Sequence, residues 1–577
     1  MLIPKILTIV FVLAGLALAL LLARAAMASR TPRALLRSAL QRLDATNRWI
    51  LIARLTFFIL LGAVIGFHSY WAFFADRDQK FNRAKQLDAR NRRLAESALK
   101  GWVLDRSRKL ENALIRYRYD GGLISRDYPL GPAAVHLTGY SDFVFGSGGI
   151  ESAFRDWLTS PDSTYNELLS PVPVGKDIAV SIDSVLQREV FGLIQATGKP
   201  AGAVVLLLPS NEVLAMASAP SFDPLTINNE ETWSSMTDQA ENAPERSPLV
   251  NRALGTLVTG GPSFYFRPGS TFKVFTAAVA IESGMTNEHF TCRGEGFTPP
   301  GFARAVRDFG GEVHGSIGFK DAFRVSCNQY FAQLGLKLGR ERMAAYARRL
   351  GISSNPESEA GRANDLWQTK NAEPKSFAFI FAPPRGRMDL TSKANSFDLA
   401  LQSFGQGYDD VTVMQMALLA AAAASPDGTL IAPSLQPDLP KKIIGPFVSA
   451  HSAAELRSLM KLVVESGTAA GAFSHLRGRI SIAGKTGSAD RDVMITNADG
   501  DPVVDFMDAQ GRPHYKYANW TDSWFIGFAP ADDPKIAFAV CVENGGQGAK
   551  TAAPIAAKIC EKAAALGYFN GAQRSNP

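Results

Sequence analysis

The segment Arg267–Lys273, RPGSTFK, constrains most strongly how this chain can fold. Its Pro-Gly pair interrupts the structure that precedes it, and the apolar run Val274–Ile281 predicts a helix that begins near Ser270. Ser270 and Lys273 are three residues apart and therefore share one face of that helix. A lysine amine that burial or a neighbouring cation keeps neutral can accept the proton of a serine hydroxyl and activate it. The segment therefore indicates a nucleophilic serine at the start of an apolar helix.

A Ser-x-x-Lys pair alone is a weak signal, because the same pattern occurs at Ser97–Lys100 and commonly marks a helix cap followed by a surface lysine. Two further patterns follow in the chain: Ser326-Cys327-Asn328, on a predicted helix, and Lys485-Thr486-Gly487-Ser488, on a predicted strand. A second Ser-x-Asn, Ser353–Asn355, lies in a turn-like stretch where that composition is ordinary. The three patterns in this order resemble the signature of penicillin-binding proteins and serine β-lactamases.

The wider chain resembles a class B, or monofunctional, penicillin-binding protein over most of residues 90–565. Similar segments are Gly202–Pro224, Asn251-Arg252-Ala253, Phe404–Gly407, Val413–Ala417 and Trp524–Pro530, with Asn91–Arg93, Gly101–Arg106 and Tyr128–Tyr140 upstream. The resemblance implies a serine transpeptidase fold of the α/β (α+β) class, with an antiparallel sheet, flanking helices and an all-helical subdomain. Strand patterns near both ends of this region, with helical patterns between them, agree with a sheet built from distant segments.

The resemblance implies a catalytic role for five motif residues. Ser270 attacks the carbonyl of the penultimate D-alanine of a stem peptide, and Lys273 is its base. Lys485 is a cation that helps to keep the Lys273 amine neutral. Ser326 relays a proton to the leaving amine, while Asn328 holds Lys273 and the substrate amide.

The resemblance also implies how the substrate is bound. Thr486 and Ser488 bind its terminal carboxylate, and Gly487 lets its backbone approach the strand closely. The backbone N–H groups of Ser270 and Ser488 form the oxyanion hole. Cys327, between the two polar residues of its motif, is expected to be a packed side chain that points away from the site.

Two alternatives from other classes share this signature. A serine β-lactamase would be a compact secreted enzyme and would need a group that activates water for deacylation, which the sequence does not identify. A membrane-anchored β-lactam sensor would retain the fold without catalysis, and the complete motif set argues against it. We therefore expect a peptidoglycan D,D-transpeptidase that works through a serine acyl-enzyme, is acylated by β-lactams and has carboxypeptidase activity as a side reaction.

Two runs without a charged residue, Ile6–Ala23 and Leu55–Phe74, are each long enough to cross a bilayer as a helix. Several arginines lie between and beside them, opposed only by Asp44: Arg24, Arg30, Arg33, Arg37, Arg42, Arg48 and Arg54. The positive-inside rule places this loop in the cytoplasm and the bulk of the chain outside. A cleaved signal peptide over residues 1–28 is the alternative, and it would reverse the second helix. We expect an uncleaved hairpin in the bacterial inner membrane, with the catalytic domain on the periplasmic side.

The expected domain order is a membrane anchor over residues 1–75, a stalk and short pedestal over 76–170, the transpeptidase domain over 171–567 and a tail over 568–577. Arg108 stands where the family has a glycine in its pedestal, which puts partner docking there in question. The segment Ala489–Asp522 contains many Gly, Asp and Asn residues and is longer than an ordinary strand connection. It predicts a mobile loop or flap beside the Lys-Thr-Gly strand.

No cofactor or metal is expected, because the four cysteines show no metal-ligand spacing and the seven histidines form no HExxH-like cluster. Cys541 and Cys560 could form a disulfide in an oxidising compartment, but we expect small buried thiols. No folded module interleaves basic and aromatic residues, so nucleic acid is not an expected partner. The resemblance implies D-Ala-D-Ala stem peptides, β-lactams, the membrane and a membrane glycan polymerase as partners.

Overall fold

The structure is a computed structural model of the 577-residue chain. It describes residues 44–74 and 99–570, except residues 121–122, 143, 161–174, 262, 356–383, 392–393, 438–439, 496, 498–501, 508–509 and 511. By the contacts within it, the chain divides into two compact units, Met1–Ser97 and Ala98–Pro577.

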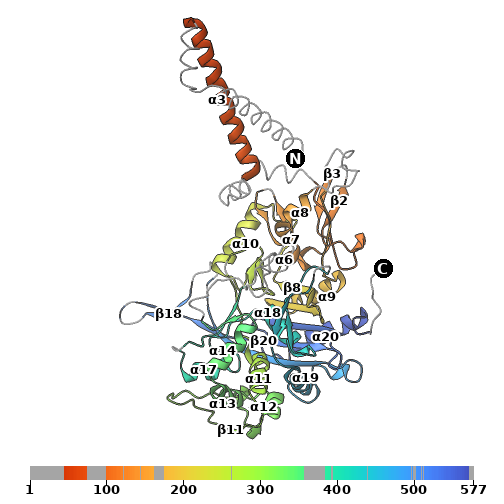
Figure 1. Ribbon diagram of the computed structural model, residues 1–577. Helices are drawn as coiled ribbons and strands as arrows, with labels where there is room; N and C mark the ends of the chain where they lie inside the picture. Colours follow the sequence, from red (N-terminus) through yellow and green to blue (C-terminus); the bar gives the residue numbers. More distant parts are fainter. Residues whose placement is uncertain are drawn as a thin grey trace. The chain divides into compact units, whose positions relative to one another are not determined.

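The described part of the first unit is one continuous helix, α3 (Ala45–Phe74), drawn in red in Figure 1. This helix covers the second apolar run of the sequence, and the side chains of Phe57, Ile59 and Phe67 along it are more than half exposed. Within the described residues, no helix combines the length and the apolarity needed to cross a membrane. The first predicted membrane segment, Ile6–Ala23, lies outside the described residues.

The second unit is built on a five-stranded antiparallel sheet in the order β17-β20-β21-β7-β8 (Figure 1). Its strands are β7 (Ala201–Leu207), β8 (Glu212–Ala219), β17 (Ala483–Met494), β20 (Tyr517–Ala529) and β21 (Ile536–Val542). Two strands near the start of the transpeptidase region therefore pair with three strands near its end, as the strand patterns predict. The central strand β21 is buried along its whole length, because helices pack on both faces of the sheet.

Two pairs of helices cover this sheet. Helices α9 (Ser184–Gln195) and α20 (Ala552–Ala565) pack against each other, and so do α18 (Val413–Ala424) and α19 (Ala450–Glu465). Every residue of α18 is buried, which agrees with its continuous run of Ala, Leu and Met. The sheet with its helices gives the second unit a mixed helix and sheet architecture, as expected from the sequence.

A further group of helices lies beyond the sheet, in the lower part of Figure 1. Its members are α11 (Lys273–Glu282), α12 (Phe319–Val325), α13 (Asn328–Leu338), α14 (Arg340–Arg349) and α17 (Ser396–Gln402), with a short hairpin of β11 (His289–Cys292) and β12 (Gly315–Gly318). The apolar pattern over Lys320–Leu338 predicts one helix, but the chain breaks between α12 and α13. Ser326 causes the break, because its backbone is left-handed with φ 66°. The Ser-x-Asn motif therefore lies at a corner between two helices, and its predicted position along a helix is wrong.

The N-terminal part of the second unit consists of short elements. They are β1 (Val103–Leu104), β2 (Arg116–Asp120), β3 (Leu123–Asp127), α6 (Val135–Thr138), α7 (Gly149–Ala153) and α8 (Arg155–Thr159), and β1 pairs in parallel with β6 (Ile178–Ala179). Glu151 is fully buried there and pairs with Lys100 at 3.2 Å and Arg126 at 2.7 Å, as a buried charge requires. Arg108 has φ 56°, which is a conformation that favours glycine and accounts for the glycine of the family.

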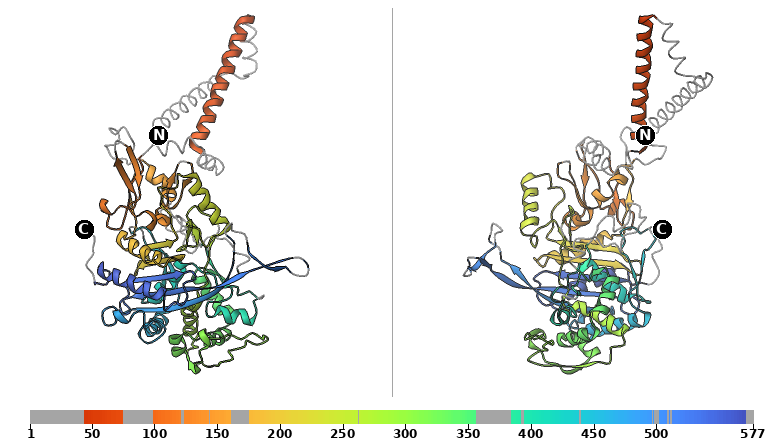
Figure 2. Two further views of the ribbon diagram at one scale, coloured as in Figure 1. Left: turned by 180° about the vertical axis from the view of Figure 1, so that it is seen from behind. Right: turned by 60° about the vertical axis from the view of Figure 1, so that its left-hand side comes forward.

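Strands β17 and β20 continue past the sheet as a two-stranded arm. They pair from Ala483 with Phe528 to Met494 with Tyr517, and a second hairpin of β18 (Val504–Met507) and β19 (Pro513–Tyr515) follows. Figure 2 shows this arm projecting from the body of the unit. The loop boundaries predicted at Ala489 and Asp522 are therefore wrong, because both residues belong to the hydrogen-bonded ladder.

We expect hydrogen exchange to distinguish the arm from the sheet. Amides of β20 from Ser523 to Ala529 are buried between two neighbouring strands, whereas Tyr517 to Trp520 lie in an exposed two-stranded ladder. Local opening of the exposed ladder costs less free energy, so its amides should exchange at least about tenfold faster. Mass spectrometry of exchanged peptides measures this difference. Equal protection of the two peptides would show that the arm is as stable as the sheet.

Candidate active site

The three sequence motifs meet at one point of the second unit. Lys273 Nζ lies 3.0 Å from Ser270 Oγ, 3.1 Å from Ser326 Oγ and 2.7 Å from Asn328 Oδ1. Lys485 Nζ lies 2.8 Å from Ser326 Oγ. The structure thus brings the five residues predicted to be catalytic into one hydrogen-bonded network. Of the other matches to these patterns, Ser353 takes no part in it, because its Oγ donates to Asn355 O. The remaining match, Ser97, lies outside the described residues.

The two lysine amines of this network share one buried space. Neither side chain has exposed surface, and Ser326 Oγ lies between them. Burial lowers the pKa of Lys273 from its ordinary value to about 8. Burial and, after it, the charge of Lys273 lower the pKa of Lys485 well below its ordinary value. Burial, and not the predicted charge of Lys485, therefore lowers the pKa of Lys273, so that about half of this amine is neutral at pH 8.

The corner at Ser326–Asn328 is held by Asp308, a residue that the motifs do not identify. The backbone N–H of Asn328 donates to Asp308 Oδ1, and Asn328 Nδ2 donates to Arg307 O at 3.1 Å. These bonds leave the side-chain oxygen of Asn328 facing Lys273. The left-handed backbone of Ser326 directs its carbonyl to the same amine, at 2.5 Å. Asp308 is therefore a positioning residue for the Ser-x-Asn motif.

The Lys-Thr-Gly strand packs directly on the turn that carries the nucleophile. Ser270 lies in a short 3-10 helix, η5 (Gly269–Phe272), and β17 runs beside it. A Cβ atom at Gly487 would lie 2.9 Å from the carbonyl oxygen of Pro268, which is too close for any side chain. Glycine is needed at this position so that the strand can pack against the turn. This requirement is separate from the predicted close approach of the substrate backbone.

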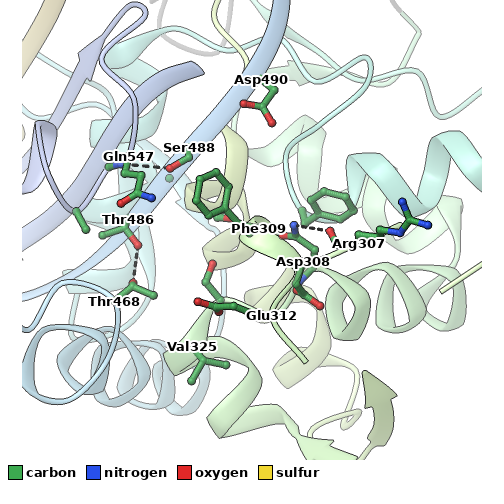
Figure 3. A pocket seen from close by; sticks show the side chains of 18 of the residues that line it. Arg307, Asp308, Phe309, Glu312, Val325, Thr468, Thr486, Ser488, Asp490 and Gln547 are labelled. Carbon is green, nitrogen blue, oxygen red and sulfur yellow. Dashed lines mark hydrogen bonds between the residues drawn. The ribbon is translucent and has the colours of Figure 1, made fainter. Parts of the chain in front are cut away.

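The hydroxyl groups of the same strand have partners from other segments. Thr486 Oγ1 lies 2.5 Å from Thr468 Oγ1, and Ser488 Oγ accepts a hydrogen bond of 3.2 Å from Gly548 N. In Figure 3, these groups form one wall, opposite Arg307, Asp308 and Phe309. Two hydroxyls on one strand can donate hydrogen bonds to a carboxylate placed between the walls.

A cleft of about 570 Å³ opens over the network. Ser270, Ser326, Asn328, Thr486 and Ser488 line it, while the two lysine amines are buried behind its wall. Residues that the motifs do not reveal complete the lining, among them Arg307, Asp308, Phe309, Glu312, Phe404, Gln406, Thr468, Asp490 and Gln547 (Figure 3). Of these, Phe404 and Gln406 belong to a segment that sequence resemblance marks, whereas the others carry no recognisable signal.

The arrangement agrees with comparisons to known proteins. Residues 202–561 match the family described as the penicillin-binding protein transpeptidase domain. The chain therefore belongs to this family, which confirms the resemblance found in the sequence.

Individual relatives support the same placement. The chain is 27% identical over 478 residues to the peptidoglycan D,D-transpeptidase PbpA of Mycolicibacterium smegmatis, covering 76% of this chain and 83% of the relative. It is 28% identical over 442 residues to the peptidoglycan D,D-transpeptidase MrdA of Acinetobacter baumannii, covering 72% and 57%. Among solved structures, penicillin-binding protein A from M. tuberculosis in a ceftriaxone acyl-enzyme complex superposes with a TM-score of 0.63, at 23% identity, over 81% of this chain and 98% of the other.

Proposed function

We propose that the protein is a peptidoglycan D,D-transpeptidase in which Ser270 forms an acyl-enzyme with a stem peptide. The observation that carries this proposal is the contact of Ser270 Oγ with the buried Lys273 amine at 3.0 Å, at the base of an open cleft. The two named relatives are D,D-transpeptidases, which supports the assignment of the reaction.

In the first step, the neutral amine of Lys273 takes the proton of Ser270, and Ser270 Oγ attacks the carbonyl carbon of the penultimate D-alanine. The amine is held for this task by Asn328 Oδ1 and by the carbonyl oxygen of Ser326. Backbone N–H groups of Ser270 and Ser488 stabilise the oxyanion of the tetrahedral intermediate. Thr486 and Ser488 bind the terminal carboxylate from the opposite wall of the cleft.

In the second step, the carbon–nitrogen bond breaks and the terminal D-alanine leaves as an amine. Ser326 Oγ lies between the two lysine amines and passes the proton from Lys273 to this leaving group. An acceptor amine from a second stem peptide then attacks the ester, and the same residues act in reverse. A β-lactam enters the first step as an analogue of the peptide end and leaves the enzyme acylated.

Penicillin acylation should depend on pH through the Lys273 amine. Below a pH of about 8 this amine is protonated and cannot accept the serine proton. The rate constant of acylation should therefore rise about tenfold per pH unit between pH 6 and 7.5 and level off above pH 8. Stopped-flow measurement with a chromogenic cephalosporin tests this. A rate that is constant from pH 6 to 9 would show that another group is the base.

The reaction itself is tested with a peptide donor that ends in D-Ala-D-Ala and a D-amino acid acceptor. A transpeptidase exchanges the terminal D-alanine for the acceptor, and mass spectrometry identifies the product. Hydrolysis without exchange would indicate a carboxypeptidase, and rapid turnover of penicillin would indicate a β-lactamase.

We further propose that the N-terminal region anchors the protein in the inner membrane, with the second unit on the periplasmic side. The uncharged runs, the arginines between them and the exposed apolar side chains of α3 support this. A membrane glycan polymerase would then be a neighbour that supplies new strands for cross-linking. Reporter fusions after Gln41 and after Lys80 should report opposite compartments. Reports from the same compartment, or a mature N-terminus near Ser29, would contradict the hairpin.

A further inference from the structure

Four charged side chains form a network at the root of the arm, where β17 and β20 leave the sheet. Arg491 pairs with Asp522 through Nε at 2.7 Å and with Glu543 through Nη2. Glu543 also pairs with Arg252 at 2.7 Å. Three of these side chains are buried, and that of Arg491 is 23% exposed. Two cations therefore balance two carboxylates in a place where an unpaired charge would be costly.

The two carboxylates of this network hold the start of one turn, residues 543–548. The chain leaves β21 at Glu543, and Asp522 Oδ1 accepts the backbone N–H of the next residue, Asn544, at 2.9 Å. Further along the turn, the N–H of Gly546 donates to Thr521 O at 2.8 Å. Burial raises the pKa of Asp522 to about 6, so this carboxyl group is ionised at neutral pH. The guanidinium of Arg491 thus separates two buried negative charges at the point where the turn begins.

The end of the same turn contacts the Lys-Thr-Gly strand. Gln547 and Gly548 line the cleft, and Figure 3 shows Gln547 on the same wall as Ser488. The N–H of Gly548 donates to Ser488 Oγ at 3.2 Å. A Cβ atom at Gly548 would lie 2.3 Å from Gly487 O, so the turn packs directly on the strand. Because Ser488 Oγ accepts this N–H, the hydroxyl keeps its own hydrogen to donate to a carboxylate in the cleft.

We propose that Arg491 positions the Ser488 hydroxyl for the carboxylate of the donor peptide or of a β-lactam. The proposal rests on the proposed function, in which Ser488 binds that carboxylate. Arg491 is not among the described residues that line the cleft, so it acts through Asp522, Glu543 and the turn 543–548.

The expected effect of losing Arg491 follows from the charges that remain. Without its guanidinium, the buried carboxylates of Asp522 and Glu543 repel each other, and the turn between them and Ser488 shifts. The group that fixes Ser488 Oγ then moves, whereas the contact between Ser270 and Lys273 lies on other elements and is retained. Recognition of a carboxylate should therefore weaken while the nucleophile stays reactive.

The test compares acylation of the full-length protein in detergent by benzylpenicillin and by its methyl ester, which lacks the negative charge. The ratio of the two second-order rate constants, acid over ester, measures recognition of the carboxylate. Arg491→Ala should lower this ratio about tenfold, as expected for a weakened hydrogen bond to a charged group, and should leave the rate for the ester unchanged. The first-order rate constant at saturating benzylpenicillin should also be retained.

Two further variants accompany this measurement. Arg491→Lys should give an intermediate ratio, because an ammonium group cannot pair with two carboxylates as the guanidinium fork does. It carries the same test if Arg491→Ala folds poorly. Lys516→Ala removes an exposed cation further along the arm and should keep the wild-type ratio.

A cycle of double variants distinguishes positioning from a general weakening of the fold. Ser488→Ala should lower the ratio by itself, and adding Arg491→Ala should lower it no further, because Arg491 acts through that hydroxyl. Arg491→Ala combined with Asp522→Asn should recover part of the ratio, since the unpaired buried charge is gone.

Three results would overturn the proposal and leave the function of Ser270 unaffected. They are an unchanged ratio in Arg491→Ala, an equal loss for acid and ester, and a further loss when Arg491→Ala is added to Ser488→Ala. Wild-type protein that neither drug acylates would instead overturn the proposed function, and this proposal with it.

Discussion

Replacement of Ser270 by alanine should abolish covalent labelling by a fluorescent penicillin. Ser270 lines the cleft, and its Oγ lies 3.0 Å from the Lys273 amine. Ser326 also contacts Lys273, but it is bonded to Lys485 as well and is placed to relay a proton. Without the Ser270 hydroxyl no ester can form, so we expect labelling to fall to background.

The controls are the two other serines that match parts of the motifs. Ser97→Ala and Ser353→Ala should label at the wild-type level, because Ser353 lies outside the network and the pattern at Ser97 is of a kind that commonly marks a helix cap. Digestion of the labelled wild-type protein followed by mass spectrometry should find the adduct on the peptide that contains Ser270. An adduct on another peptide, or rapid release of hydrolysed drug, would contradict the proposed mechanism.

Replacement of Lys273 by alanine should slow acylation by roughly 10²–10⁴-fold, the usual loss when a general base is removed. The amine lies 3.0 Å from Ser270 Oγ and has a pKa of about 8, so it is both near enough and basic enough for the task. Rate constants from a time course with fluorescent penicillin measure the effect. The variant should also lose the rise in rate between pH 6 and 8.

The variant Lys485→Ala distinguishes the role of Lys485 from that of Lys273. This residue contacts Ser326 Oγ and does not contact Ser270 directly, so its loss should weaken carboxylate recognition and proton relay. We expect a larger effect on the apparent affinity for penicillin than Lys273→Ala shows, and a retained dependence on pH. If Lys273→Ala acylates at the wild-type rate while Lys485→Ala does not, Lys485 is the base.

The sequence predicts the chemistry of this site better than its backbone. Ser270, Lys273 and Lys485 could be identified because each occurs in a short pattern with fixed spacing. Asp308 could not, because it acts on Asn328 through a backbone hydrogen bond, and a bond of this kind leaves no motif. The corner at Ser326 could not be predicted either, because the apolar spacing of the flanking residues continues across it as it would in one unbroken helix.

The strands of the arm are a second feature that sequence patterns could not predict. Polar residues such as Asp490 and Asp492 alternate with others along β17 beyond the sheet, where one face of the ladder is exposed and the other is only partly buried. A strand without a buried face has no apolar period, and its composition resembles that of a loop. The buried strands β7 and β21, by contrast, are apolar throughout and were predictable.

The burial of Lys273 has a consequence for the whole fold. A pKa lowered from 10.5 to about 8 means that below pH 8 the native state holds this charge at a penalty of roughly 3 kcal/mol compared with the unfolded chain. The penalty declines as pH rises from about 8 to 10.5, because the native state releases the proton first. At neutral pH the amine that makes Ser270 reactive thus opposes folding, and the packed sheet and helices must offset it. Selection for a reactive serine and selection for a stable domain act against each other at this residue.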